Sequence, residues 1–255
     1  MSTEISDRGY WDEVHGLHKV DIAASLRGYW MRKLSRFLAS FLAPDETKRF
    51  VELGGAPGLY PILFHQVFGY QPYVIDYSEP GIQETWRNFE LLGLPSSNAV
   101  MLDFLQEGAL RSYENYFDVV ASIGLLEHFA EPSHVLDLHI SILKGGGDLI
   151  IQIPVFNSVF RLQPFFKRGV CKQHNLSLMN LDAFSHIVTS AKDIEVRYLG
   201  YFGGINLGVP RSDSYMLGTI MGQMQKFTEA IQLESILPLN KYTSPYLMCV
   251  AKKSS

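Results

Sequence analysis

Short apolar runs alternate with segments of helical periodicity through the middle of the chain. The apolar runs, each bounded by small, acidic or polar residues, are 50–53, 73–76, 99–102, 117–122 and 149–153. The intervening segments with apolar side chains at helical spacing are 61–68, 80–92 and 134–143. Because strands that alternate with helices form parallel sheets covered on both faces, the pattern predicts an α/β fold with a doubly wound sheet.

The two ends of the chain add further elements. Apolar side chains at helical spacing over 10–42 predict one or two N-terminal helices that end at Ala43 and Pro44 and cover an edge of the sheet. After the central region, the pattern predicts a helix over 181–191, a strand over 194–198, a loop over 201–208, a helix over 214–237 and a final strand over 246–251.

The composition fits one folded domain. Of the 255 residues, 47% are hydrophobic and 19% are charged, which is enough apolar surface for a core and too little charge for disorder. The formal net charge is -4 and no basic run occurs, so the charge pattern of a nucleic-acid binder is missing. No apolar stretch approaches the roughly 20 residues of a membrane span, and the first residues lack a signal-peptide core. We expect a cytoplasmic protein, monomeric or homodimeric, with no nucleic-acid or membrane partner.

The chain offers no spacing typical of a metal site. Cys171 and Cys249 are the only cysteines and stand far apart, and the eight histidines form no H-x-x-x-H pair beside a carboxylate cluster. The sequence therefore predicts no metal ion.

A glycine-rich turn follows the first apolar run. Gly54, Ala56 and Gly58 stand at alternate positions, and Glu52 lies two residues before the first of them. Small residues at such a turn let the backbone approach a ligand closely, because no long side chain intervenes. The spacing differs from the G-x-G-x-x-G of dinucleotide-binding proteins.

Acidic residues end the next two apolar runs. Asp76 comes about 20 residues after the glycine turn, where a carboxylate can accept both hydroxyl protons of a ribose. Asp103 and Phe104 follow the third run in the same way. Because the carboxyl ends of parallel strands share one edge, these residues are expected near the glycine turn.

Together with the stretches 123–129 and 143–154, these motifs resemble the class I S-adenosylmethionine-dependent methyltransferases over roughly residues 47–154. One departure is Ala56, which stands where the family usually has a glycine. The resemblance implies a Rossmann-like sheet of seven strands that ends in an antiparallel hairpin. It also implies S-adenosylmethionine as the cofactor, with the following binding residues: Glu52, Gly54, Gly55, Ala56, Gly58, Asp76, Tyr77, Asp103, Phe104 and Ser122.

The resemblance also implies a division of labour along the chain. Residues 1–46 are expected to form an N-terminal helical cover and 47–255 the methyltransferase core, with 155–180 and 201–240 as lid elements over the substrate. The candidate substrate-binding residues are Tyr10, Trp11, His15, His128, His174 and Tyr201. His128 is the candidate catalytic base, since a histidine can take a proton near neutral pH if it reaches the acceptor; contact without proton transfer, or packing alone, are the alternatives.

The expected reaction is methyl transfer to a small molecule, with a hydroxyl of a sugar or natural product as the first choice and nitrogen or carbon still open. The chain lacks the N/D-P-P-F/Y tetrapeptide and the Pro-Cys nucleophile of nucleic-acid methyltransferases. Two other classes compete. A non-catalytic scaffold could keep the cofactor fold, whereas a nicotinamide-dependent oxidoreductase should carry G-x-G-x-x-G and Tyr-x-x-x-Lys, which are not found in suitable places.

Overall fold

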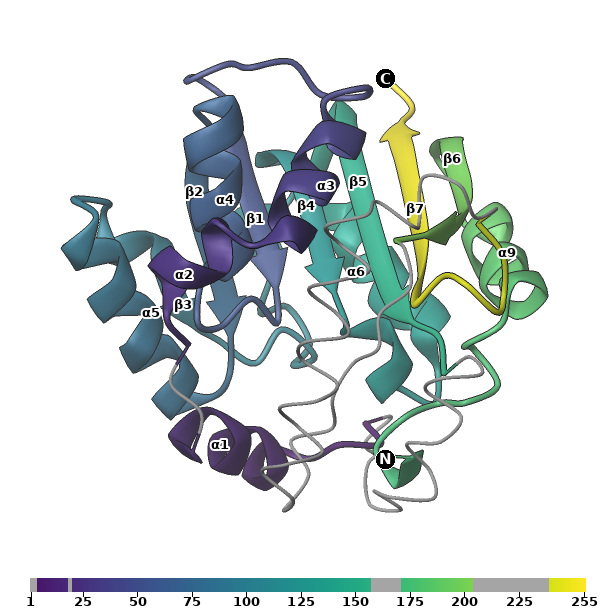
Figure 1. Cartoon of the computed structure of the whole chain (residues 1–255), viewed down its shortest axis with the longest axis horizontal. Coiled ribbons are helices and arrows are strands. Elements are labelled where there is room, and N and C mark those ends of the chain that lie inside the picture. Colours follow the sequence, from purple (N-terminus) through teal and green to yellow (C-terminus); the bar gives the residue numbers. More distant parts are fainter. Residues whose placement is uncertain (1–3, 18–19, 157–170, 204–238) are drawn as a thin grey trace.

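The computed structural model describes residues 4–17, 20–156, 171–203 and 239–255. These residues form one sheet in the strand order β3-β2-β1-β4-β5-β7-β6, with helices on both faces (Figure 1). The strands are β1 Arg49–Leu53, β2 Gln71–Asp76, β3 Ala99–Met101, β4 Phe117–Ile123, β5 Leu143–Pro154, β6 Ile194–Phe202 and β7 Tyr246–Lys253. The α-helices are α1 Arg8–Leu17, α2 Ile22–Leu26, α3 Tyr29–Leu38, α4 Leu59–Phe68, α5 Glu79–Leu91, α6 Pro132–Ile142 and α9 Leu181–Ser190. The short 3-10 helices are η1 Ser96–Asn98, η2 Arg111–Tyr113 and η3 Leu126–His128.

The pairing of the strands confirms the doubly wound, seven-stranded prediction. Strands β1 to β5 pair in parallel, and β7 runs antiparallel to both β5 and β6. The strand order reverses between β1 and β4, which makes this the switch point of the sheet. In open α/β sheets, ligands bind outside the carboxyl ends of the strands at such a point.

Neighbouring side chains of each strand enter different halves of the core. Phe50 of β1 stacks on Phe64 of α4, with ring centroids 3.9 Å apart, while Val51 joins the cluster that contains Phe184 of α9. This alternation follows from the pleat of a strand. The sheet is therefore fixed from both sides, and its carboxyl edge is held in place for a site.

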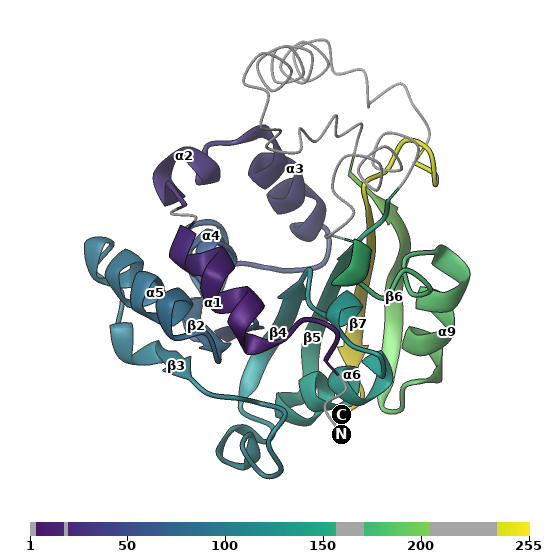
Figure 2. The same cartoon turned by 90° about the horizontal axis from the view of Figure 1, so that it is seen from below.

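The prediction of one or two N-terminal helices that end at Ala43 and Pro44 is wrong. The N-terminal region contains α1, α2 and α3, and α3 ends at Leu38. The helical periodicity is interrupted because Asp21 caps the start of α2 and Gly28 that of α3, both with extended backbone. Only α1 lies across the carboxyl edge of the sheet (Figures 1 and 2), whereas α2 and α3 pack on α4 and cover a face.

The region after β5 also departs from its prediction in one place. Tyr201 and Phe202 belong to β6 and pair with Leu247 and Tyr246 of β7, so the expected loop does not begin at Tyr201. The helix expected over 214–237 and most of the two lid ranges lie outside the described residues. The division into 1–46 and 47–255 stays a prediction.

Candidate active site

A cavity of about 150 Å³ lies at the carboxyl ends of β1, β2 and β4, beside α1. The lining residues that the sequence predicted are Gly54, Ala56, Asp76, Tyr77, Phe104, Trp11, His15 and His128. Those that it missed are Glu4, Ser6, Ile123, Gly124, Leu125 and Phe129. The cavity thus brings together half of the expected cofactor residues and half of the expected substrate residues.

The glycine turn forms one wall of the cavity. Gly54 has φ +66°, and a Cβ added there would lie 2.8 Å from Cδ1 of Leu125, so only glycine fits without a shift. The same turn has room for the methyl group of Ala56 because the residue of α5 that faces it, Gly81, has no side chain. A Cβ added at Gly81 would lie 2.7 Å from the Ala56 Cβ. The departure from the family motif at Ala56 is therefore matched by a second glycine on α5.

Asp76 connects the glycine turn to the turn after β2. Its Oδ2 accepts a hydrogen bond from the Ala56 N–H at 3.1 Å, and its Oδ1 accepts one from the Ser78 N–H at 2.9 Å. Burial raises the pKa of Asp76, while these two bonds and the nearby His15 oppose that effect. The carboxylate keeps further lone pairs at the cavity, which suits it to accept hydrogen bonds from a diol.

The remaining cofactor candidates do not line the cavity. Glu52 is buried beneath Gly55, with Oε2 3.0 Å from the place where a Gly55 Cβ would stand. Asp103 accepts bonds from the Leu105 N–H at 3.1 Å and the Gln106 Nε2 at 3.2 Å, within its own turn. The candidates in this group are Glu52, Gly55, Gly58, Asp103 and Ser122. Their cofactor roles stay predictions.

The N-terminal segment is bonded to two sides of the cavity. The Ile5 N–H donates to the His128 carbonyl at 2.7 Å, and the Ser78 hydroxyl donates to Oδ1 of Asp12 at 2.8 Å. These bonds hold α1 across the carboxyl edge, as Figure 2 shows. As a result Trp11, which is far from the motifs in sequence, lines the same cavity.

Aromatic and imidazole rings form one end of the cavity. The Trp11 ring meets the His128 ring edge to face at 4.8 Å between centroids, and it stacks on His15 at 6.1 Å. The His174 ring lies 4.5 Å from that of His128, behind the lining. These four rings come from α1, η3 and the segment before α9, which the fold brings to one place.

Two predicted substrate residues lie elsewhere. The Tyr10 ring contacts Trp11 at 5.1 Å between centroids, outside the lining. Tyr201 lies on β6 and packs against the core cluster that contains Phe184 of α9. A role for Tyr10 or Tyr201 in substrate binding stays a prediction.

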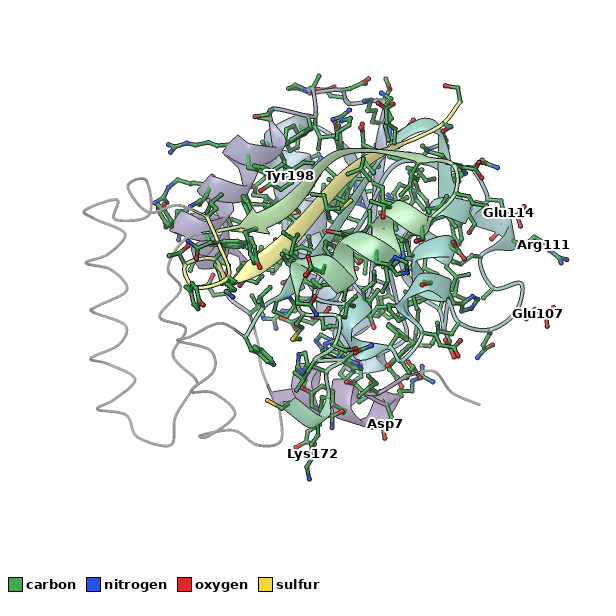
Figure 3. The ribbon with its side chains drawn as sticks, turned by 90° about the vertical axis from the view of Figure 1, so that its right-hand side faces the viewer. Asp7, Glu107, Arg111, Glu114, Lys172 and Tyr198 are labelled. Atoms are coloured by element: carbon green, nitrogen blue, oxygen red, sulfur yellow. The ribbon has the colours of Figure 1, made fainter. Side chains whose placement is uncertain are left out.

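His128 is held by a backbone carbonyl. Its Nδ1 lies 2.8 Å from the Gln173 carbonyl and 2.8 Å from the Ser6 hydroxyl. Since a carbonyl only accepts, Nδ1 carries the proton and Nε2 keeps a lone pair. Burial, with His174 as the second cause, lowers the pKa of His128 to about 3, so the ring is neutral at physiological pH and a weak base. Figure 3 shows Asp7 and Lys172, neighbours of Ser6 and Gln173, at the same end of the molecule.

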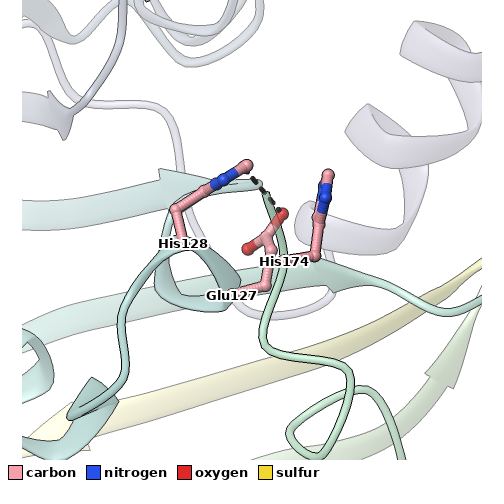
Figure 4. A group of neighbouring side chains, drawn as sticks. All are labelled: Glu127, His128 and His174. Carbon is pink, nitrogen blue, oxygen red and sulfur yellow. Dashed lines mark ion pairs between the residues drawn. The ribbon is translucent and has the colours of Figure 1, made fainter. Parts of the chain in front are cut away.

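Glu127 stands beside His128 and was missed in the sequence. It is 1% exposed, its Oε1 lies 3.8 Å from Nε2 of His128 (Figure 4), and burial raises its pKa to about 8. An acidic residue next to the candidate His128 was a usable signal. Ser6 gave none, because it meets His128 from 122 positions away in the sequence.

A family model described as a methyltransferase domain matches residues 22–191, more than half of the chain. The chain belongs to this methyltransferase family. A methyltransferase solved in complex with the Haloferax volcanii Trm112 methyltransferase activator is 14% identical to it, with a TM-score of 0.61 over 96% of this chain and 98% of that one. A SAM-dependent methyltransferase from Archaeoglobus fulgidus is 18% identical, with a TM-score of 0.55 over 90% of this chain and 96% of that one.

A curated relative of this methyltransferase is a tRNA U34 carboxymethyltransferase of Syntrophotalea carbinolica. The two are 26% identical over 125 residues, which span 47% of this chain and only 36% of the relative. The protein is a class I methyltransferase, an enzyme that uses S-adenosylmethionine, as its motifs indicated. The family is one of methyltransferases, which opposes the oxidoreductase alternative, and the scaffold alternative is left to the labelling experiment below. Among the residues that the structure describes, no helix combines the length and apolar character needed to cross a membrane.

Proposed function

We propose that this methyltransferase acts on a hydroxyl group of a small polar metabolite, such as a sugar or a natural product. The observation that supports this choice is the ring-lined end of the cavity, where Trp11 and the neutral His128 meet. Aromatic walls shield a reacting pair from water, and the Nε2 lone pair can accept a hydrogen bond from a hydroxyl.

The other end of the cavity fits the cofactor. A side chain at Gly54 would fill the cradle there, and Asp76 offers lone pairs for a ribose diol. S-adenosylmethionine, when bound, supplies a methyl group on a positively charged sulfur. Asp76, Gly54 and Ala56 would hold it, so the wall from Trp11 to His128 is left for the acceptor.

The role that we propose for His128 is to orient the acceptor. A hydroxyl that donates its hydrogen bond to Nε2 turns an oxygen lone pair toward the cavity, and alignment of this kind is a major source of rate enhancement. When the acceptor oxygen is methylated, its hydroxyl proton must leave. Because burial holds the pKa of His128 at about 3, the ring does not keep this proton, which passes on to water.

A nucleic-acid acceptor is the second candidate, because the curated relative is named as a tRNA methyltransferase. The net charge of -4 opposes it, since binding to phosphate backbones depends on basic residues. By analogy with the neighbour bound to Trm112, an activator protein is a candidate for an additional partner. Action without nucleic acid, a cytoplasmic location and a monomeric or homodimeric state stay predictions.

One labelling experiment separates these candidates. The protein is incubated with S-adenosylmethionine carrying a ¹³C methyl group, in parallel with fractionated metabolite extract and with total tRNA, and Asp76→Asn, which we expect to bind the cofactor more weakly, serves as the control. We expect a new O-methyl carbon signal in a small-molecule fraction. Label in tRNA, or label only on nitrogen or carbon, would overturn the proposed acceptor class.

A further inference from the structure

Glu127, His128 and His174 bring three ligand atoms together next to the cavity. One oxygen or nitrogen atom of each side chain lies within 4.8 Å of the others (Figure 4). Glu127 and His128 come from η3 after β4, and His174 comes from the segment before α9. No spacing in the sequence predicts this group, because the third member is far from the first two.

One oxygen of the buried Glu127 carboxyl group lacks a hydrogen-bond partner. Its side chain is 1% exposed, and within the described part of the chain its Oε2 has no hydrogen-bond partner. An oxygen of this kind costs free energy unless an attractive group reaches it. A cation between the three side chains would be such a group.

His128 is already in the tautomer that a metal requires. Its Nδ1 donates to the Gln173 carbonyl at 2.8 Å, which leaves the Nε2 lone pair on the side of Glu127, 3.8 Å from Oε1. Histidines that bind metals typically donate their other N–H to a carbonyl or carboxylate, which fixes the ring in this way. The Ser6 hydroxyl, which donates to the same carbonyl at 2.9 Å, holds the arrangement from the N-terminal segment.

We propose that Glu127, His128 and His174 bind one divalent transition-metal cation, with Zn²⁺ as the best match. Two imidazoles and one carboxylate are a ligand set of open catalytic zinc sites, whereas Mg²⁺ prefers oxygen ligands. Zinc bonds of about 2.0–2.1 Å place tetrahedral ligand atoms roughly 3.4 Å apart, so binding must draw the side chains together by up to about 1.4 Å. This inference replaces the absence of metal that the sequence spacing predicted.

The cation would lie at the ring-lined end of the cavity, since His128 lines it. A cation on Nε2 of His128 uses the lone pair that would otherwise accept the hydrogen bond of the hydroxyl. If the proposed function is right, the acceptor hydroxyl would therefore take the open position on the cation instead, and it would lose its proton to water more easily there, because a bound cation lowers the pKa of its oxygen ligands. This consequence rests on the proposed function, but the binding site itself does not.

Metal binding is tested without any methyl-transfer assay. The full chain is stripped with a chelator, and Zn²⁺ and Co²⁺ are titrated by calorimetry and by the visible absorption of Co²⁺. We expect one ion per chain, no comparable binding of Mg²⁺, and at least a roughly tenfold loss of Zn²⁺ affinity in Glu127→Gln and in His174→Asn. The matched control is His134→Asn on the exposed face of α6, which should bind Zn²⁺ like the wild type.

The result that would overturn the site is unchanged Zn²⁺ affinity in both ligand variants, or no stoichiometric binding by the wild type. Far-UV circular dichroism identifies a variant that fails to fold, in which case the Co²⁺ spectrum of the wild type decides: bands of an octahedral aquo ion contradict the proposal, and strong bands of a low-coordinate site support it. Failure of the proposed function would show instead in the ¹³C-methyl assay, with metal binding intact.

Discussion

The contact between α5 and the glycine turn gives a sharp prediction for Gly81→Ala. A Cβ at Gly81 would lie 2.7 Å from the Ala56 Cβ and 3.0 Å from Cδ2 of His15. Both neighbours line the cavity, so they cannot move apart without changing its wall. The substitution should therefore destabilise the fold and weaken cofactor binding together.

Two opposing terms set the magnitude. Alanine in place of a helical glycine stabilises a helix by roughly 0.5–1 kcal/mol, while overpacking costs about 1–3 kcal/mol. We expect the overpacking to prevail, because the Ala56 methyl is fixed to the backbone and cannot rotate away. The net loss in the free energy of unfolding should be up to about 2.5 kcal/mol.

Urea unfolding and calorimetry with S-adenosylhomocysteine measure the two effects. The matched control is Gly16→Ala in α1, where nothing lies within 4 Å of an added Cβ, so only the helix-stabilising term applies. The double variant Gly81→Ala with Ala56→Gly removes the clash between the two methyl groups and should recover most of the loss, apart from the contact to His15. Additive effects of the two changes would refute the packing argument.

Three further outcomes are expected. Asp76→Asn should weaken S-adenosylhomocysteine binding roughly 10- to 100-fold, the scale of a lost charge-assisted hydrogen bond, whereas Asp137→Asn on the exposed face of α6 should leave the calorimetric Kd unchanged. Trp11→Ala should raise the acceptor KM far more than it weakens cofactor binding; equal losses would contradict its place at the acceptor end. Burial lowers the pKa of His139 to about 4, so this residue should reduce stability by up to about 3 kcal/mol as pH drops from 6.5 to 4. In unfolding curves, His139→Phe should make the pH slope shallower by that amount and leave the contribution of His128, and His134→Asn is the control.

The positions of the strands along the chain were predictable because each strand leaves a local signature in the sequence. An apolar run such as the one that ends at Leu53 must be buried on both faces, and the helix that starts after Gly58 follows directly from it. The N-terminal helices were less predictable. A continuous apolar period over 10–42 gives no indication that the caps at Asp21 and Gly28 divide it into three, because the choice depends on packing against α4.

The cofactor end and the acceptor end of the cavity also differ in how well the sequence predicts their residues. Gly54 and Asp76 act through backbone geometry and a strand end, so their positions in the motifs sufficed to bring them to the cavity. Ser6 acts through contacts across the fold, which its residue type does not predict, whereas Glu127 stands beside His128 in the sequence and could have been chosen. Gly81 is of the same kind as Ser6, since its need to be small comes from Ala56 on another element.

This difference also explains why the cofactor of the enzyme is clear and its acceptor is a proposal. The cofactor half is built within the βα units of the sheet, where the motifs lie. The acceptor half is built from α1, the loop after β4 and the segment before α9, joined at the Ser6, His128 and Gln173 hydrogen bonds. Two of these three segments lie outside the motifs, so exchanges of their residues can alter acceptor choice while the glycine turn is kept. His15 of α1 is an exception, because it acts on the pKa of Asp76, and the residues to exchange between relatives are therefore those that surround His128.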